Sequence, residues 1–344
     1  MMAFFSIVPA LAVFPACSRA AYILMGQFIA HTRVTGRTHC GPNPSPFNQH
    51  YTGRPAVDGI LCFLVAFFHA SFTAPVFPLV TTFGALLAPL VLLPTIEGSR
   101  ASRSLIFTPL VTVAFGLAYQ LKGAGALFPL FWLAMVLSGH ARMHARPAAA
   151  RGSSIDQAHA EANLFALVVG YLAPSVAMCV LEDPKMTALW QPFPVWIALA
   201  RALYLLLRPR ARSSGYFTVQ ATFALTFALS AVVHVHTAWS LRQDLSALAL
   251  AFIPRVAPPI GEDTLLPLPM AALGMLQWDM YATLGSGILG ALWFADSIGQ
   301  GVGVLLWSVG ASLGLGPGAA ISALLMWRES KLNGRAKKNG LKRS

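Results

Sequence analysis

The sequence predicts an all-α fold, a polytopic transmembrane helical bundle with about eight to ten spans. Its composition is the first reason: 56% of the 344 residues are hydrophobic and only 10% are charged, whereas a soluble domain carries about 25% charged residues. The second reason is that apolar runs recur at the length a helix needs to cross a bilayer, about 20 residues. These runs lack the polar–apolar alternation of barrel strands, so we expect helices.

The expected spans begin after a less regular N-terminal part. Residues 1–20 are apolar but lack a basic start, so they fit either a retained anchor, which we favour, or a signal peptide cleaved near Cys17. A polar loop rich in proline and glycine follows over residues 31–54. We expect spans at residues 57–73, 76–95, 105–121, 125–140, 162–181, 190–207, 216–238, 269–296 and 302–327.

We therefore interpret residues 1–344 as a single integral membrane domain. It consists of an N-terminal anchor and polar loop (1–56), a helical bundle (57–327) and a basic cytoplasmic tail (328–344). Residues 244–269 contain several prolines and predict a loop against the membrane surface.

The net charge of +12 indicates membrane lipid as a partner and no nucleic acid, because the basic residues lie in short loops and in the tail. Such residues set the orientation of a membrane protein and contact anionic headgroups. The tail and the Arg208–Arg212 cluster both predict the cytoplasmic side. Three expected spans separate them, which would place them on opposite sides unless residues 243–268 add a short or re-entrant segment.

Asp279 is the best candidate for chemistry. It lies within the apolar run Met270–Phe294, between Trp278 and Tyr281. An ionisable side chain at membrane depth normally faces a bundle interior or a cavity. Low-dielectric surroundings favour a protonated carboxyl group, which is the form a general acid needs. The alternative is an aspartate that Gln277 or a neighbouring helix satisfies.

Two further acids lie near expected span ends. Glu97 precedes Arg100 by three residues, so an ion pair at the membrane interface is the alternative to catalysis. Asp58 begins a span four residues after Arg54, and ion pairing or a favourable charge at a helix N-terminus would explain it equally. Other acids, Glu329 among them, fall where solvated charge is expected.

The sequence gives no support for a metal or a cofactor. The Walker A, CxxC and HExxH motifs are absent, and so are the DDxxD and DxDD clusters of soluble terpene cyclases. His140 and His144 have metal-compatible helical spacing, but arginines surround them and no carboxylate adjoins them. The four cysteines show no ligand spacing, so we interpret them as structural.

Several short motifs resemble a family of fungal membrane-bound terpene cyclases of meroterpenoid pathways, the ascofuranone and macrophorin type. Where that family usually has tyrosine beside the acid of its LQ-D motif, this chain has Trp278. The matching motifs are YTGRPAVDGILCFLVAFFHA (Tyr51–Ala70), Glu97 with Arg100, Gln120 with Gly123–Gly125 and Pro129, and LQWD (Leu276–Asp279) with Trp293.

The resemblance implies a cofactor-independent enzyme of an internal membrane, the endoplasmic reticulum. It would protonate a terminal epoxide or olefin of a prenylated aromatic or polyketide substrate, and a prenyltransferase and an epoxidase would serve the same pathway. Carried over by position, Asp279, Glu97 and Asp58 are the catalytic candidates. Carbocations are attracted to aromatic faces. The candidate substrate-binding residues are Gln120, Trp278, Tyr281, Trp293 and Trp132.

Two other functions fit the same residues. A transporter or efflux protein for a lipophilic metabolite would use intramembrane acids as proton or substrate sites. A non-catalytic membrane protein would instead scaffold pathway enzymes. Conversion of a prenylated aromatic epoxide by microsomes distinguishes the enzyme from both.

Overall fold

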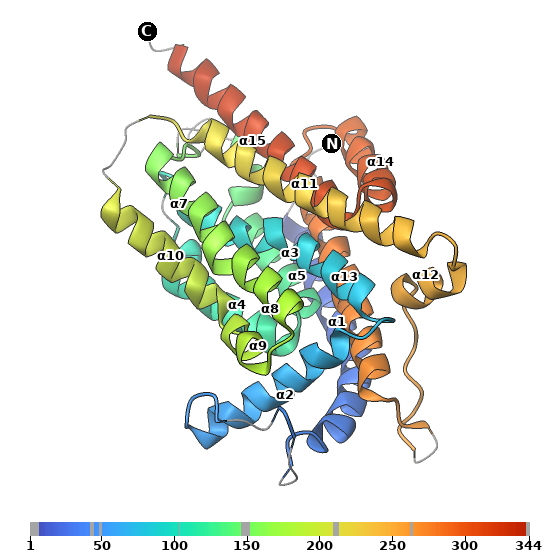
Figure 1. The fold of residues 1–344 in the computed structure, drawn as a ribbon. Coiled ribbons are helices and arrows are strands. Elements are labelled where there is room, and N and C mark those ends of the chain that lie inside the picture. Colours follow the sequence, from blue (N-terminus) through green and yellow to red (C-terminus); the bar gives the residue numbers. More distant parts are fainter. Residues whose placement is uncertain are drawn as a thin grey trace.

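The computed structural model describes residues 7–41, 45–47, 50–102, 104–145, 152–208, 213–261 and 264–341. Figure 1 shows that these ranges form an all-helical bundle. Within them, the only β-type pairing is an isolated bridge between Asp156 and Ser214. The expected all-α class is therefore confirmed.

The helices follow the predicted order along the chain, with short breaks between them. The longer helices are α1 (Ile7–Arg37), α2 (Pro55–Ser71), α3 (Phe77–Gly98), α4 (Pro109–Lys122), α5 (Ala124–Leu137), α7 (Gln157–Leu167), α8 (Ala173–Leu181), α10 (Phe193–Leu207), α11 (Tyr216–Leu241), α13 (Leu268–Leu292), α14 (Ile298–Gly314) and α15 (Pro317–Leu341). Shorter elements are η1 (Leu105–Phe107), η2 (His140–Ala145), the π-helical η3 (Val168–Leu172) between α7 and α8, α9 (Pro184–Trp190) and α12 (Leu245–Phe252).

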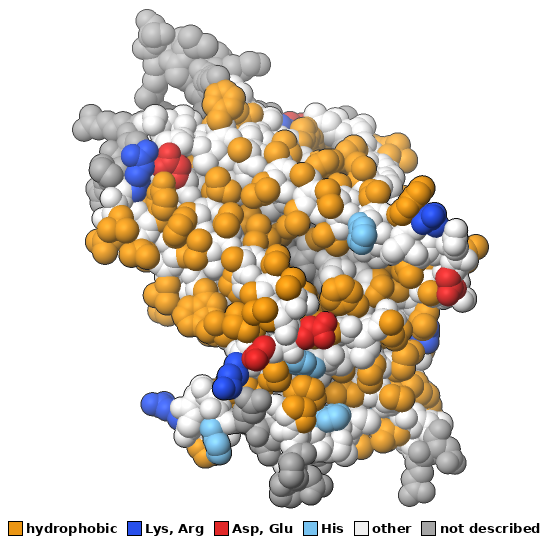
Figure 2. All heavy atoms as spheres, in the orientation of Figure 1, with side chains coloured by type: hydrophobic (Ala, Val, Ile, Leu, Met, Phe, Trp, Pro, Cys, Tyr) orange, Lys and Arg blue, Asp and Glu red, His pale blue; other side chains and the backbone are white. Residues whose placement is uncertain are grey.

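Several of these helices are long and apolar enough to cross a bilayer. In the described ranges four meet that condition, namely α1, α3, the continuous α7–α8 segment and α11; a fifth is added if α9 and α10, bent by 64°, count as one span. The expected count of eight to ten is not confirmed, because apolar helices such as α2 and α5 are shorter than a full span. Figure 2 shows a flank covered largely by apolar side chains, as a membrane protein requires.

The last expected span, residues 302–327, is wrong as a single helix. The helix is interrupted between Gly314 and Pro317, where Gly316 adopts a φ of +95° that a residue with a side chain rarely tolerates. A Cβ atom on Gly316 would lie 2.6 Å from His234 Cβ, so this turn packs directly on α11. α14 and the start of α15 therefore form a hairpin.

α11 and α15 run antiparallel along their length. Thr226 Oγ1 and Ser322 Oγ are 2.9 Å apart, and Gln220 Nε2 donates to Met326 O at 3.0 Å. Tyr216, at the start of α11, hydrogen-bonds Ser330. The chain before α11 and the end of α15 thus lie at the same end of the bundle, which removes the topological conflict that the sequence presented.

α13 occupies the centre of the bundle and packs against α1 and α5. Small residues permit the close approach: a Cβ atom on Gly290 would lie 2.3 Å from Trp132 ring atoms, and one on Gly274 would lie 2.1 Å from the Phe28 ring. α1 is one continuous helix although it contains Pro15.

At the opposite end of the bundle from the end of α15, a disulfide joins Cys40 to Cys62 on α2 (Figure 1). It fastens the loop after α1 to α2. Cys17 and Cys179 are free thiols.

Candidate functional site

The Asp279 side chain is buried where α13, α1 and the start of α5 meet. Its Oδ1 accepts a hydrogen bond from the Gly125 N–H, and the Ala124 N–H also contributes to holding the carboxyl group. A Cβ atom on Gly123 or Gly125 would lie within 3.2 Å of Oδ1. The GAG sequence therefore allows the first turn of α5 to approach the carboxyl group.

In this arrangement, backbone N–H groups at the start of α5 are the hydrogen-bond donors to the Asp279 carboxyl group. The first N–H groups of a helix have no partner inside the helix and carry partial positive charge. Asp279 is only 5% exposed, and a buried carboxylate is usually paired with a cation. Within the described residues, however, no lysine or arginine forms an ion pair with it. These N–H groups can therefore stabilise a negative charge on this carboxyl group.

Gln277 and Trp278 of the LQWD motif, and Tyr281 beyond it, contact the end of α12 and the residues just after it. Gln277 Nε2 donates to Leu250 O at 2.9 Å and to Ala251 O at 3.0 Å. Trp278 Nε1 donates to Arg255 O at 2.7 Å, and Tyr281 Oη donates to Phe252 O at 2.6 Å. Trp278 and Tyr281 thus anchor the segment 250–255 by their polar atoms. The segment expected as a loop over 244–269 contains the short helix α12 instead of being wholly irregular.

Trp293 directly follows the last residue of α13, and Trp132 lies on α5. The ring centroids of Trp293 and Phe14 are 5.3 Å apart, those of Trp132 and Phe294 are 6.1 Å apart, and both pairs are tilted. Both side chains are almost fully buried in the hydrophobic core. Their faces pack against other aromatic rings and the α13 backbone.

Glu97 belongs to a buried ionic cluster at the end of α3. Arg100 Nη2 and Arg328 Nη1 donate to Glu97 Oε1 at 2.8 Å and 2.7 Å, and Arg328 Nη2 donates to Oε2 at 3.0 Å. Arg100 also pairs with Glu329. The ion pair with Arg100 that the sequence left open is present. Glu329, expected as a solvated acid, is 5% exposed, so that expectation is wrong.

Asp58 lies in the first turn of α2 and orders the preceding loop. The Thr52 N–H and Oγ1 both donate to Asp58 Oδ1, each at 2.7 Å. Its other oxygen, Oδ2, is buried and lies 3.9 Å from His50 Nδ1. Asp58 therefore holds the 50–52 loop against the start of α2. The ion pair with Arg54 that the sequence suggested does not form among the described residues.

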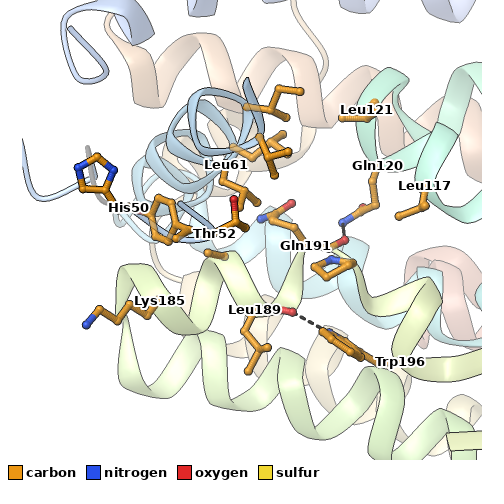
Figure 3. Close-up of a pocket in the computed structure, with 16 residues that line it drawn as sticks. His50, Thr52, Leu61, Leu117, Gln120, Leu121, Lys185, Leu189, Gln191 and Trp196 are labelled. Carbon is orange, nitrogen blue, oxygen red and sulfur yellow. Dashed lines mark hydrogen bonds between the residues drawn. The ribbon is translucent and has the colours of Figure 1, made fainter. Parts of the chain in front are cut away.

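A cavity of about 790 Å³ lies between α2, α4, α9 and the start of α10 (Figure 3). His50 and Thr52, which Asp58 orders, line one side, and Gln120 lines the other. Gln120 Nε2 donates to Gln191 O at 3.1 Å. The structure therefore brings two sequence candidates, Asp58 and Gln120, to the surroundings of one cavity.

The three candidate acids occupy separate neighbourhoods. Asp279 does not line the cavity: Gln120, at the end of α4, lines it, whereas Asp279 accepts its hydrogen bond from the Gly125 N–H at the start of α5. Glu97 belongs to the end of the bundle where α15 ends. Gln191, which also lines the cavity, was missed by sequence reasoning, and no local pattern around it signals a site.

Two other patterns carry no visible chemistry. Residues 310–314 read GASLG and match GxSxG, but they lie on helix α14 rather than on the strand-to-helix turn that exposes a nucleophilic serine. Within the described residues, no group of three histidine, cysteine or acidic side chains could hold a metal ion.

Comparison with known proteins gives the family. Residues 24–332 match the family model described as CtvD domain. The chain belongs to this family. The CtvD-domain chain is also 25% identical over 256 residues to a Penicillium polonicum protein named FAD-dependent monooxygenase verC1, covering 69% of this chain and 30% of that protein. It thus spans less than a third of the length of that relative. No solved structure matches it.

Proposed function

We propose that this CtvD-domain protein is a membrane-bound terpene cyclase of fungal secondary metabolism. Its substrate is a lipophilic molecule in which a prenyl chain is attached to an aromatic or polyketide head. The enzyme protonates a terminal epoxide or olefin and the chain then closes into a ring, without nucleotide or metal.

The reaction is an isomerisation that needs no co-reactant. A carboxylic acid gives its proton to the epoxide oxygen, the carbon–oxygen bond breaks, and the electron-deficient carbon is attacked by an alkene or a hydroxyl group of the same molecule. Loss of a proton from the closed ring gives the product and restores the acid. Exclusion of water protects the cation from hydrolysis.

The observation that carries this proposal is the environment of Asp279. Its carboxyl group is buried in a helical bundle with neutral backbone N–H partners, the setting in which a carboxyl group can donate a proton and leave a stabilised anion. Glu97, by contrast, is held by Arg100 and Arg328 and is poorly suited to donate one. We therefore assign Asp279 as the acid.

The relative supports an epoxide as the reacting group. A flavin monooxygenase inserts one oxygen atom into its substrate, and an alkene substrate then becomes an epoxide. A protein named as such a monooxygenase contains a region similar to this chain, and this similarity motivates the choice of an epoxide.

The test uses microsomes from a host that expresses the full chain. They are incubated with a farnesylated phenol bearing a terminal epoxide, in the presence of EDTA and without nucleotides. We expect a cyclic product of unchanged mass that control microsomes do not form. Uptake without conversion would instead indicate a transporter, and a product that gains water would indicate an epoxide hydrolase.

A further inference from the structure

The cavity between α2, α4, α9 and α10 has one polar end and one apolar end. The exposed side chains of His50 and Lys185 border it on one side, and Leu117 and Leu121 of α4 border it on the other (Figure 3). Leu121 is 56% exposed on the surface of the bundle. A molecule in this cavity could therefore face water with its head while its tail follows the apolar surface.

Gln191 supplies an unused hydrogen-bond acceptor to this cavity. The residue is 5% exposed, and its Oε1 is buried without a hydrogen-bond partner among the described residues. Its other polar atoms are engaged, because Nε2 donates to Thr187 O at 3.3 Å and the backbone oxygen accepts from Gln120 Nε2. Buried polar atoms in native proteins are almost always paired, so this oxygen indicates a missing donor.

The volume and the lining of the cavity suit a small-molecule ligand. Ligand pockets usually measure about 300–1,000 Å³, are mostly apolar and contain a few placed polar groups. Here leucine and isoleucine side chains of α2 and α4 form the wall, and Gln191 lies between them and α10.

We propose that this cavity is a binding site for a lipophilic molecule with a phenol or hydroxyl head, whose O–H donates a hydrogen bond to Gln191 Oε1. The site is separate from Asp279, which does not line the cavity. The hydrocarbon tail lies against the leucines of α2 and α4. The choice of a prenylated phenol rests on the proposed function, whereas the requirement for a donor follows from Gln191 itself. An ether at the same position cannot satisfy this oxygen and should bind less well.

The test measures binding, not turnover, so it is independent of the cyclase proposal. The full chain is placed in nanodiscs and titrated with a radiolabelled phenol carrying a saturated farnesyl tail, which cannot react. The methyl ether of the same compound is titrated in parallel. We expect the phenol to bind the natural protein roughly tenfold more tightly than the ether, because one hydrogen bond is lost.

Two variants and one control complete the design. Gln191→Leu should abolish the preference for the phenol while the ether binds as before. Ala188→Phe, which fills the cavity, should weaken binding of both compounds at least tenfold. Gln27→Leu, at an exposed position on α1, should match the natural protein. Thermal unfolding confirms that each variant is folded.

Equal affinity for phenol and ether in the natural protein, or unchanged binding in folded Ala188→Phe, would overturn this assignment. A positive binding result with no cyclised product in the microsome assay would leave the binding site standing and remove the cyclase. The two proposals therefore fail separately.

Discussion

Asp279, Glu97 and Asp58 differ in what their carboxyl oxygens contact. Backbone N–H groups hold Asp279, two guanidinium groups hold Glu97, and a threonine holds Asp58. A cation beside a carboxylate stabilises its charge and opposes protonation. Burial without a cation has the opposite effect, so the same residue type serves different purposes in the three places.

We expect Asp279→Asn to lower turnover about 100- to 10,000-fold, the usual contribution of a general acid. Asparagine keeps a carbonyl oxygen for the Gly125 N–H but has no acidic proton to give. The rate of product formation per folded protein measures the effect. Asp244→Asn, at the N-cap of α12, is the control, because asparagine caps a helix as well as aspartate does. A normal rate in Asp279→Asn would remove Asp279 as the acid.

Glu97→Gln should act on stability more than on chemistry. The change leaves Arg100 and Arg328 buried with one carboxylate fewer, and breaking a buried ion pair costs about 3–5 kcal/mol of unfolding free energy. Thermal unfolding in detergent would measure the loss. Glu161→Gln is the control, because its partner Arg208 is partly exposed and such pairs contribute about 0–1 kcal/mol.

If the folded fraction of Glu97→Gln turns over normally, Glu97 is a structural residue. A stable but inactive variant would return it to the catalytic candidates.

The sequence identified the buried acid but not its partner. Asp279 stands out because it interrupts a long apolar run, which is a local signal. Gly125, whose N–H it accepts, is 154 residues away, and only tertiary packing brings the two together. For the same reason, the sequence predicted only part of the ionic cluster. Arg100 is near Glu97 in sequence, but Arg328 and Glu329 are not.

At the scale of the helix, close packing of α13 depends on particular glycines. Gly290 faces the Trp132 ring, whereas Gly285 on the same helix has no atom within 4 Å of an added Cβ. We expect Gly290→Ala to lower the unfolding free energy by about 1–3 kcal/mol through overpacking. Gly285→Ala should be neutral or stabilising by up to about 1 kcal/mol, because alanine favours the helix. Thermal unfolding of both variants would measure the difference, and equal melting temperatures would contradict the packing argument.

Apolar runs predicted where helices lie better than where they break. The runs over 76–95 and 216–238 correspond to α3 and α11. The run over 302–327 hides a turn, because GLGPG contains no charged or hydrogen-bonding side chain that would interrupt the run. A hydrophobicity pattern alone therefore misses this turn. The glycines and the proline indicate it only when their backbone preferences are considered as well.

For the whole molecule, the α14–α15 hairpin reconciles two orientation signals. The basic Arg208–Arg212 cluster precedes α11, and the basic tail follows the part of α15 that pairs with the start of α11. Positive loops favour the cytoplasmic side. The Cys40–Cys62 disulfide lies at the opposite end, and disulfides persist in oxidising compartments. Both signals therefore agree on one orientation.

We expect the tail in the cytoplasm and the loop before α2 in the lumen. The natural sequence has no N-x-S/T glycosylation acceptor with x other than proline, so single substitutions can report each side without background. His50→Thr creates an acceptor at Asn48, and Leu341→Thr creates one at Asn339. Only His50→Thr should gain a glycan that endoglycosidase H removes, because glycans are added in the lumen. Glycosylation of the tail acceptor alone would reverse the orientation and place the disulfide in a reducing compartment.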